Sequence, residues 1–323
     1  MSPFAIGVDL GGTNLKVGLV HAERGVVRQT QNPTEAEQGP EHVLDAIADA
    51  VRRALDGLPD GADFAGIGLG APGTISWDRT TVSHPPNFPG WREVDVADAL
   101  RRRLATDGPV IVENDANVAG LGSAFYGAGR EFDSFIMVTL GTGVGGAIIY
   151  QNKIFRGATG GAGEIGHVSL DYEGPYARSG VPGAAEAYLG QQFLSHHARY
   201  QLLNRPTRLH DTCRPDLQGL TPKDLHTAAE AGDQAARDVL AWAGHKLGVL
   251  LGSAVNLLDI RKIVVGGGVS HAGDFILEPA RLALRQFVMP GLQADLEIVR
   301  ETLGNEVALL GAARLAFEYV EER

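Results

Sequence analysis

The chain has 323 residues, of which 44% are hydrophobic, and its formal net charge is −11. That length suits two domains of ordinary size, and the hydrophobic content excludes a disordered chain. The acidic balance argues against nucleic acid as the main partner, because phosphate backbones attract Lys and Arg. The single cysteine, Cys213, excludes an internal disulfide. We see no signal peptide and no uninterrupted membrane-length apolar run, so we expect a cytoplasmic protein with no membrane partner.

Two segments of the chain share one pattern: FAIGVDLGGTNLKVGLVH at 4–21 and SFIMVTLGTGVGGAIIY at 134–150. Each is an apolar run, a turn rich in Gly and Thr, and a second apolar run, which predicts a hairpin of two strands. A supersecondary unit that recurs about 130 residues later indicates duplication. The two hairpins therefore predict a duplicated α/β fold.

The remaining elements alternate between strand and helix patterns, which is typical of α/β architecture. Apolar spacing and flanking turn residues predict strands and helices. The expected strands cover 64–69, 110–112 and 262–265; the expected helices cover 41–58, 115–126, much of 185–253, 275–287 and 309–319. The segment 203–219 has no clear periodicity, and we assign it no function.

The first hairpin turn carries Asp9, Gly11, Gly12, Thr13 and Asn14. Glycine lets backbone N–H groups approach a phosphate closely, and the Thr13 hydroxyl adds a donor. Asp9 could hold Mg²⁺, directly or through water, because Mg²⁺ prefers a carboxylate or two together with phosphates. The alternative is a tight hairpin with no ligand.

The second hairpin turn, from Gly141 to Gly146, matches G-x-G-x-x-G. A dinucleotide site needs a helix after the glycines, but residues 147–150 have the pattern of a strand, so we reject that interpretation. With the first turn, Thr142 and Gly143 would instead clamp a polyphosphate. Gly267 and Gly268 follow a predicted strand and either contact a nucleotide or form a tight connection.

These motifs together resemble the ROK family of bacterial sugar kinases and repressors, within the actin-like ATPase superfamily. The matching segments are DLGGTNLKVGLV, GLGAPGTI, NFPGW, VENDANVAGLGSA, TLGTGVGGAII, GGAGEIGH, EAYLG, VVGGGVS and LLGAA, in the family's order. The resemblance implies two duplicated ribonuclease H-like domains with a central cleft. We expect one domain at 1–115 plus a C-terminal helix at about 306–323, and the other at 116–305.

The resemblance also implies an activity: ATP-dependent phosphorylation of a hexose, most simply glucose to glucose 6-phosphate, with Mg²⁺. Asp115 matches the family's catalytic base, and a carboxylate at a strand end can accept the proton of the attacking hydroxyl. The alternative is that Asp115 only caps the next helix. Sugar hydroxyls would be bound by Asn87, Asn114, Glu164, His167 and Glu186. The family also implies a homodimer or higher homo-oligomer.

The sequence departs from the family at one place. Many ROK proteins carry C-x-C-G-x-x-G-C after the GH motif and bind a structural zinc, but residues 177–184 read ARSGVPGA. Without thiolates, His167 alone cannot hold a structural zinc, so we predict no zinc. We expect Pro175 and Pro182 to restrict the loop and Ala177 and Ala184 to pack in place of the thiolates.

Other functions stay open at this point. N-acetylhexosamine, fructose and mannose kinases share these motifs, and a non-catalytic sugar sensor could keep the fold. A repressor would carry a helix-turn-helix domain ahead of the first phosphate turn, where Asp9 already lies, so we expect an enzyme. A hydride-transferring dehydrogenase rests only on the G-x-G-x-x-G match.

Overall fold

The computed structural model describes residues 3–322. Met1, Ser2 and Arg323, at the outer limits of the first expected domain, lie outside the described residues. The chain divides into two compact units. The first comprises Met1–Asp133, Ala147–Gly163 and Leu303–Arg323, and the second comprises Ser134–Gly146 and Glu164–Thr302.

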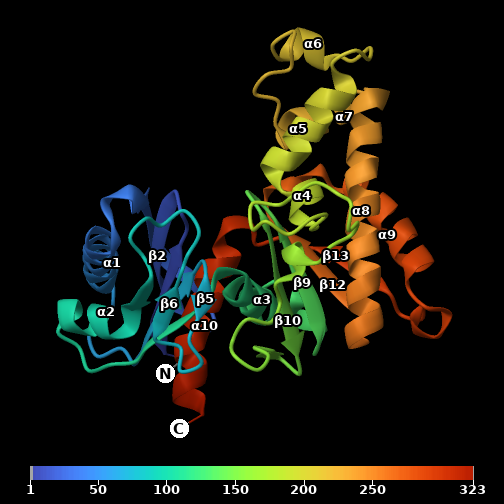
Figure 1. Ribbon diagram of the computed structural model, residues 1–323. Helices are drawn as coiled ribbons and strands as arrows, with labels where there is room; N and C mark the ends of the chain where they lie inside the picture. Colours follow the sequence, from blue (N-terminus) through green and yellow to red (C-terminus); the bar gives the residue numbers. More distant parts are fainter. Residues whose placement is uncertain (1–2, 323) are drawn as a thin grey trace. The chain divides into compact units, whose positions relative to one another are not determined.

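The first unit is built on a five-stranded mixed sheet (Figure 1). Its strand order is β3-β2-β1-β4-β8, in which β1, β4 and β8 run parallel and β2 runs antiparallel to both of its neighbours, β1 and β3. The strands are β1 (Phe4–Leu10), β2 (Asn14–His21), β3 (Gly25–Pro33), β4 (Phe64–Ala71) and β8 (Val110–Asn114). A small antiparallel sheet is formed by β5 (Thr74–Ile75), β6 (Thr81–Ser83) and β7 (Glu93–Asp95).

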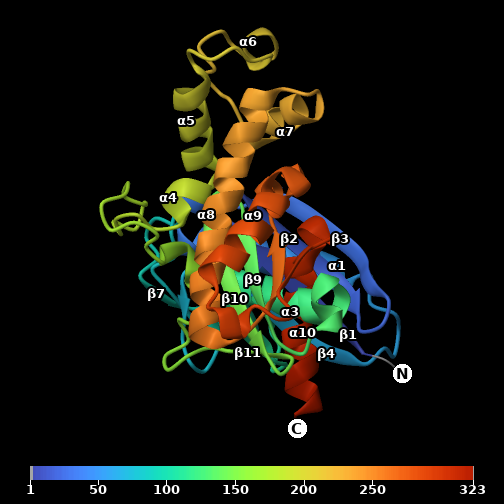
Figure 2. The same cartoon turned by 90° about the vertical axis from the view of Figure 1, so that its right-hand side faces the viewer.

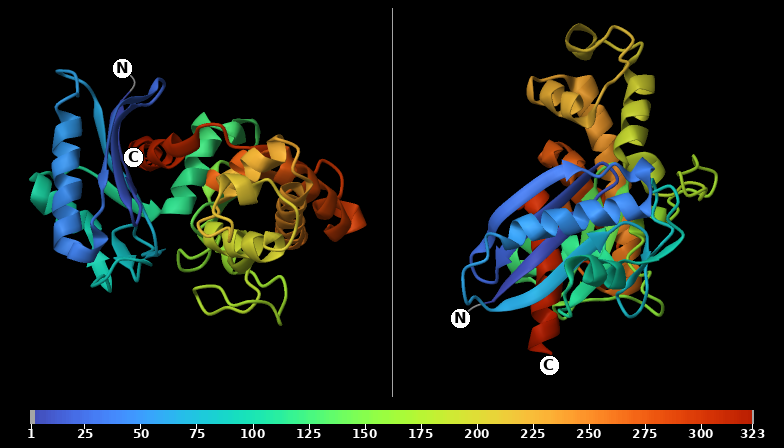
Figure 3. Two further views of the ribbon diagram at one scale, coloured as in Figure 1. Left: turned by 90° about the horizontal axis from the view of Figure 1, so that it is seen from above. Right: turned by 90° about the vertical axis from the view of Figure 1, so that its left-hand side faces the viewer.

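Helices cover both faces of the first sheet, as the view from above shows (Figure 3). Because side chains alternate across a strand, Ile6 and Val8 join the core under α1 (Pro40–Leu55) and α2 (Val96–Leu104). Ala5 joins the opposite core, under α3 (Asp115–Tyr126) and α10 (Val307–Glu321). Asp9 shares the parity of Ala5 and therefore lies on the α3 and α10 face.

The second sheet repeats the order of the first, as β11-β10-β9-β12-β13. Its strands β9 and β13 flank β12 and run parallel to it, and β10 and β11 run antiparallel to each other. They are β9 (Phe135–Leu140), β10 (Val144–Tyr150), β11 (Lys153–Ile154), β12 (Lys262–Gly266) and β13 (Glu297–Arg300). The shared order confirms the duplicated α/β fold that the two hairpins predict.

The helices of the second unit are dominated by the 25-residue α8, which packs along α9 (Figure 2). Glycines at every fourth position, Gly244, Gly248 and Gly252, face α9, where a Cβ would overlap its atoms. This seam lets the two helix backbones approach closely. The helices are α4 (Glu186–Leu189), α5 (Gln191–Leu202), α6 (Leu209–Thr212), α7 (Pro222–Glu230), α8 (Gln234–Leu258) and α9 (Asp274–Phe287).

The predicted elements are confirmed, and a few others were missed by sequence reasoning. The missed elements are β3, the small sheet, α2, β11 and β13. The start of α2 did carry a signal, because the Asp95 carboxylate caps it by accepting from the N–H of Asp98 at 2.9 Å. Short 3₁₀ turns occur at Ala36–Gln38, Ala128–Glu131, Ile165–His167, Gly268–Ala272, Pro290–Leu292 and Gly304–Glu306. Within residues 3–322, we find no helix with both the length and the apolar character needed to span a bilayer.

Candidate active site

The first Gly/Thr turn joins β1 to β2 and is pinned by backbone bonds. The N–H of Gly11 donates to the carbonyl of Asn14 at 2.9 Å, and the Thr34 hydroxyl donates to the carbonyl of Gly11 at 2.6 Å. Gly12 and Thr13 are exposed. Asp9, just before the turn, pairs with Lys16 at 3.0 Å, and the Asp9 side chain is 17% exposed. A rigid turn with exposed backbone and a nearby carboxylate suits a phosphate with its metal ion.

The carboxyl ends of β1 and β8 place Asp9 and Asn114 along one edge of the first sheet. Asp9 is in register with Gly70, and Ala71 is in register with Asn114. Ligands of open α/β sheets bind outside the carboxyl ends of parallel strands. Asn87, in the left-handed conformation at φ 67°, also lies here, since a Cβ on Gly12 would stand 3.6 Å from its Cβ.

Asn114 and Asp115, at the start of α3, have different roles in the helix. The helix is capped by Asn114, whose Oδ1 accepts from the N–H groups of Ala116 at 2.9 Å and Asn117 at 3.2 Å. The Asn114 amide also donates to the carbonyl of Gly73 at 3.3 Å. The N-cap position is therefore filled by Asn114. Asp115 is partly exposed, and its Oδ1 accepts from the N–H of Ala116 at 2.8 Å.

A carboxylate that sequence reasoning missed lies directly before this pair. Glu113 is fully buried, and it contacts the guanidinium groups of Arg79 at 3.1 Å and Arg156 at 2.8 Å. The one signal in the sequence was a charged residue inside the apolar strand VIVEN. Burial lowers the pKa of Arg156, and the charge of Glu113 opposes that shift.

The second Gly/Thr turn joins β9 to β10 in the second unit. The N–H of Gly141 donates to the carbonyl of Gly143 at 3.0 Å, as in the first turn. Glu186 lies against this turn, where its Oε2 accepts from the N–H of Val144 at 3.2 Å. A Cβ on Gly143 would collide with that oxygen, so glycine is required for the contact.

Three predicted sugar-binding residues gather around Val144. Besides the bond to Glu186, the carbonyl of Val144 packs so closely on Gly166 that a Cβ there would overlap it. Gly166 belongs to the 3₁₀ turn that carries His167 and follows Glu164, and the His167 Nε2 lies 3.7 Å from a Glu164 oxygen. The Glu186 carboxylate and the 3₁₀ turn that follows Glu164 and carries His167 thus both contact Val144. Two carboxylates and an imidazole on such a frame suit recognition of a ring of hydroxyls.

The segment that lacks the family's cysteines is packed and hydrogen-bonded by its own residues. Ala177, Ala184 and Ala187 form a small buried cluster, against which Val181 and Phe193 pack. Backbone bonds close the loop, for example from the N–H of Gly183 to the carbonyl of Pro175 at 2.8 Å. At its tip the Ser179 hydroxyl lies 3.1 Å from the Nδ1 of His167. No group of three or more potential metal-binding His, Cys, Asp or Glu side chains occurs among residues 3–322.

Gly267 and Gly268 follow β12 at the carboxyl edge of the second sheet. β12 ends in register with β9, with Gly266 opposite Thr139. Gly267 has φ 84° and packs on Leu140, the last residue of β9, where a Cβ would not fit. Both glycines are exposed, and a Cβ on Gly268 would meet no atom within 4 Å. Exposed, side-chain-free backbone beside the second turn fits a nucleotide.

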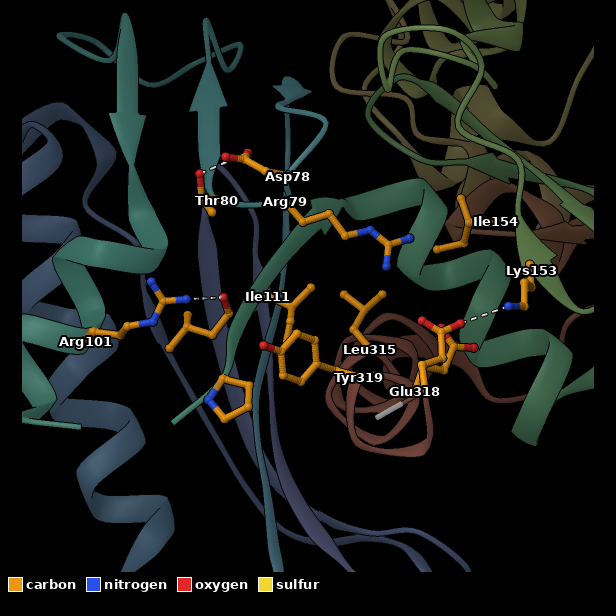
Figure 4. A pocket seen from close by; sticks show the side chains of 13 residues that line it. Asp78, Arg79, Thr80, Arg101, Ile111, Lys153, Ile154, Leu315, Glu318 and Tyr319 are labelled. Atoms are coloured by element: carbon orange, nitrogen blue, oxygen red, sulfur yellow. Dashed lines mark hydrogen bonds and ion pairs between the residues drawn. The ribbon is translucent and has the colours of Figure 1, made fainter. Parts of the chain in front are cut away.

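A cavity of about 380 Å³ in the first unit lies apart from these residues (Figure 4). Its walls include Arg79, Ile111, Lys153, Leu315 and Glu318. None of the predicted site residues lines it. Arg79 lines this cavity and also contacts Glu113. The cavity therefore adjoins the buried pair next to the candidate site and not the site itself.

Two sheets of one strand order, each with a Gly/Thr hairpin at the carboxyl edge of its parallel strands, define the actin-like ATPase class of fold. The sequence pattern of the ROK family matches residues 5–318, and the chain belongs to that family.

Relatives with known names agree over nearly the whole chain. It is similar to a glucokinase of Halalkalibacterium halodurans, with 36% identity over 321 residues that cover 96% of this chain and 94% of the relative. It also resembles a ROK family glucokinase from Streptomyces griseus solved with glucose and AMPPNP, with TM-score 0.84, 33% identity, and 98% and 99% of the two chains covered. A ROK hexokinase from Thermus thermophilus gives TM-score 0.78 and 30% identity over 99% and 100%.

Proposed function

We propose that this chain is an ATP-dependent glucose kinase that yields ADP and glucose 6-phosphate. The proposal is carried by Asp115, a partly exposed carboxylate at the sheet edge that also holds the first Gly/Thr turn, with the capping role taken by Asn114. The similarity to named glucokinases supports glucose as the sugar.

The chemistry assigned to the first unit is proton removal and phosphate binding. Asp115 accepts the proton of the sugar hydroxyl as that oxygen attacks the γ-phosphorus and ADP leaves. Gly11, Gly12, Thr13 and Asn14 bind phosphate oxygens. Asp9 fits Mg²⁺ through water, because it is a hard oxygen donor at the strand end whose charge Lys16 already balances in part. The ion neutralises phosphate charge when bound.

The second unit supplies the remaining contacts. Glu164, His167 and Glu186 bind hydroxyls of the sugar, with Asn87 and Asn114 of the first unit as further contacts. Thr142 and Gly143 bind phosphate oxygens, and Gly267 and Gly268 pack against the nucleoside.

The first test is a panel of hexoses with ATP in a coupled assay of ADP release. We expect glucose to give the highest kcat/KM. Preference for an N-acetylhexosamine, fructose or mannose would reassign the substrate. No sugar-stimulated turnover with any member would favour a non-catalytic sugar sensor.

The second test is Asp115→Ala. Positioned acid–base catalysis is worth roughly 10²–10⁴-fold, so we expect kcat to fall at least about a hundredfold while glucose binding, measured by calorimetry, is kept. Asp60→Ala, at an exposed position outside the site, is the control. Near-normal turnover in Asp115→Ala would reject this residue as the base.

Assembly and location are also proposals. We propose a homodimer or higher homo-oligomer on the basis of the family resemblance, and a cytoplasmic location because the named relatives are glucokinases. Light scattering of the purified protein tests the first, and cell fractionation tests the second.

A further inference from the structure

A fully buried charged side chain at the end of a hydrophobic strand needs a reason. The Glu113 carboxylate, at the end of β8, has no exposed surface. Acidic side chains are almost never fully buried unless they are paired, because burial removes their hydration. Glu113 immediately precedes the Asn114–Asp115 corner, so whatever it contacts is tied to the proposed base.

The two oxygens of Glu113 have separate partners. Oε2 lies 2.8 Å from the Nε of Arg156 and accepts from the Nε of Arg79 at 3.1 Å. Oε1 accepts from the N–H of Asn114 at 2.9 Å and from the Nδ2 of Asn117 at 3.1 Å. One carboxylate oxygen therefore faces two cations, and the other holds the first turn of α3.

The two arginines bring two other segments to the same point. The Nη1 and Nη2 of Arg156 donate to the carbonyls of Trp77 at 2.7 Å and Ser76 at 2.9 Å, and its guanidinium lies over the Trp77 ring at 5.1 Å. Arg79 closes the turn at 76–79, because its N–H donates to the carbonyl of Ser76 at 3.0 Å, and its own carbonyl accepts from the N–H of Val112 at 2.9 Å. Figure 4 shows the extended Arg79 side chain among the residues that line the cavity.

Arg156 also begins the glycine-rich loop that leads to Glu164. Gly160 in that loop has φ 99°, and a Cβ on it would stand 2.6 Å from the Ile75 carbonyl and 3.2 Å from the Nη2 of Arg156. The loop therefore packs directly on the guanidinium. Through Arg156, one carboxylate links the helix start, the 76–79 turn and the loop at 157–163.

We propose that Glu113 is a positioning residue for phosphoryl transfer: clamped by Arg79 and Arg156, it fixes the Asn114–Asp115 corner in one arrangement. Its catalytic meaning rests on the proposed function, because Asp115 is the group that it positions. The physical reason is that a buried carboxylate has no water to replace a lost partner. All four contacts must then be kept together, and the backbone N–H of Asn114 is one of them. A misplacement of about 1 Å can cost roughly a hundredfold in rate.

The main variant is Glu113→Gln, which keeps the size of the side chain and removes its charge. We expect kcat to fall about 10- to 100-fold, while the KM for ATP changes less than about twofold, because no nucleotide contact is assigned to Glu113. Asp233→Asn is the matched control, since Asp233 is also a buried, hydrogen-bonded carboxylate but belongs to the cap of α8. It should lower the melting temperature and leave kcat unchanged.

A double-variant cycle with Arg79→Gln separates positioning from general destabilisation. If Arg79 acts through Glu113, the kcat of the double variant should equal that of Glu113→Gln within about a factor of two. If instead the kcat of the double variant falls by the product of the two single-variant effects, Arg79 and Glu113 act independently and the shared positioning role is wrong. All rates are compared well below each variant's melting temperature.

Hydrogen exchange supplies a readout that needs no activity. In Glu113→Gln the amides of 114–117 should exchange faster, while those of β1 should not change. If the amides of Glu113→Gln exchange faster but the wild-type protein itself phosphorylates no sugar, the proposed kinase function is wrong, whereas the role of Glu113 in fixing the Asn114–Asp115 corner is supported. An active wild type with unchanged kcat and protection in Glu113→Gln would overturn the positioning role alone. If Glu113→Gln does not fold, Arg79→Gln takes its place. We then expect faster exchange at the Asn114 amide and a lower kcat. Wild-type values for both would overturn the proposal.

Discussion

At the scale of single residues, the candidate site depends on which polar atoms the protein already uses. The side-chain oxygen of Asn114 caps α3, and its side-chain NH₂ donates to the carbonyl of Gly73. His167 is bonded on Nδ1 by Ser179, so its Nε2 is the ring nitrogen left to face a ligand beside Glu164. Ser179 lies in the segment where other family members carry cysteines, and here its hydroxyl orients the imidazole directly.

Ser179→Ala tests that orientation. Loss of one hydrogen bond is worth about 0.5–1.5 kcal/mol, so we expect the KM for glucose to rise roughly 2- to 12-fold with little change in kcat. Steady-state kinetics measure this. Ser195→Ala, which removes an exposed hydroxyl bonded to the Gln191 carbonyl on α5, is the control. An unchanged KM would show that Ser179 does not orient His167.

At the scale of elements, glycines decide how closely α3 and α10 approach each other and the first sheet. A Cβ on Gly68 of β4 would overlap the Ala312 carbonyl of α10, and one on Gly311 of α10 would overlap the Val118 carbonyl of α3. The start of α3, and Asp115 with it, is therefore positioned by backbone contacts that cannot yield as a flexible side chain would.

Gly311→Ala should destabilise the fold although alanine is the better helix former. The helix preference is worth about 1 kcal/mol, whereas overpacking against fixed backbone costs about 1–3 kcal/mol or more. We expect the overpacking cost to exceed the gain in helix preference, so that urea unfolding gives a lower free energy of unfolding for Gly311→Ala than for the wild type. Gly291→Ala, whose Cβ would only touch the flexible Met289 at 3.7 Å, should be near neutral. A stabilised Gly311→Ala would contradict the packing argument.

The loop at 171–187 is the second element-scale case. Backbone bonds and the alanine cluster hold it, so its stability should not depend on a metal. We predict that elemental analysis of purified protein finds no stoichiometric zinc and that a chelator leaves the melting temperature unchanged. One zinc per chain would refute this.

At the scale of the whole molecule, stability depends on pH through buried carboxylates. Glu318 on α10 has a side chain that is only 20% exposed, and burial raises its pKa above the ordinary 4.5, although Arg314 and Arg79 oppose the shift. The folded state then holds this proton more tightly than the unfolded state. The contribution of Glu318 to stability is complete below about pH 4.5 and falls as pH rises through the folded-state pKa.

Glu318→Gln should therefore be more stable than the wild type at pH 7, and the difference should shrink toward zero below the ordinary pKa. Thermal unfolding across pH 4 to 8 measures the gap. Glu131→Gln, at an exposed carboxylate, should give no such pattern. A variant that is less stable at pH 7 would mean that the contact with Arg314 outweighs the cost of burial.

The sequence by itself determined the duplicated α/β fold and the family, because apolar periodicity and glycine turns are local features that repeat along the chain. It also pointed to Asp115, since the motif around it is contiguous. The predicted roles of the site residues and the expected domain limits stay predictions. Only the tertiary structure decided that Asn114 is the cap, that Glu186 bonds to Val144 and that Ser179 reaches His167. It also placed Glu113 between two arginines that lie 34 and 43 residues away in the chain. Such contacts join residues that are distant in sequence, and burial and partner choice depend on packing that no local pattern encodes.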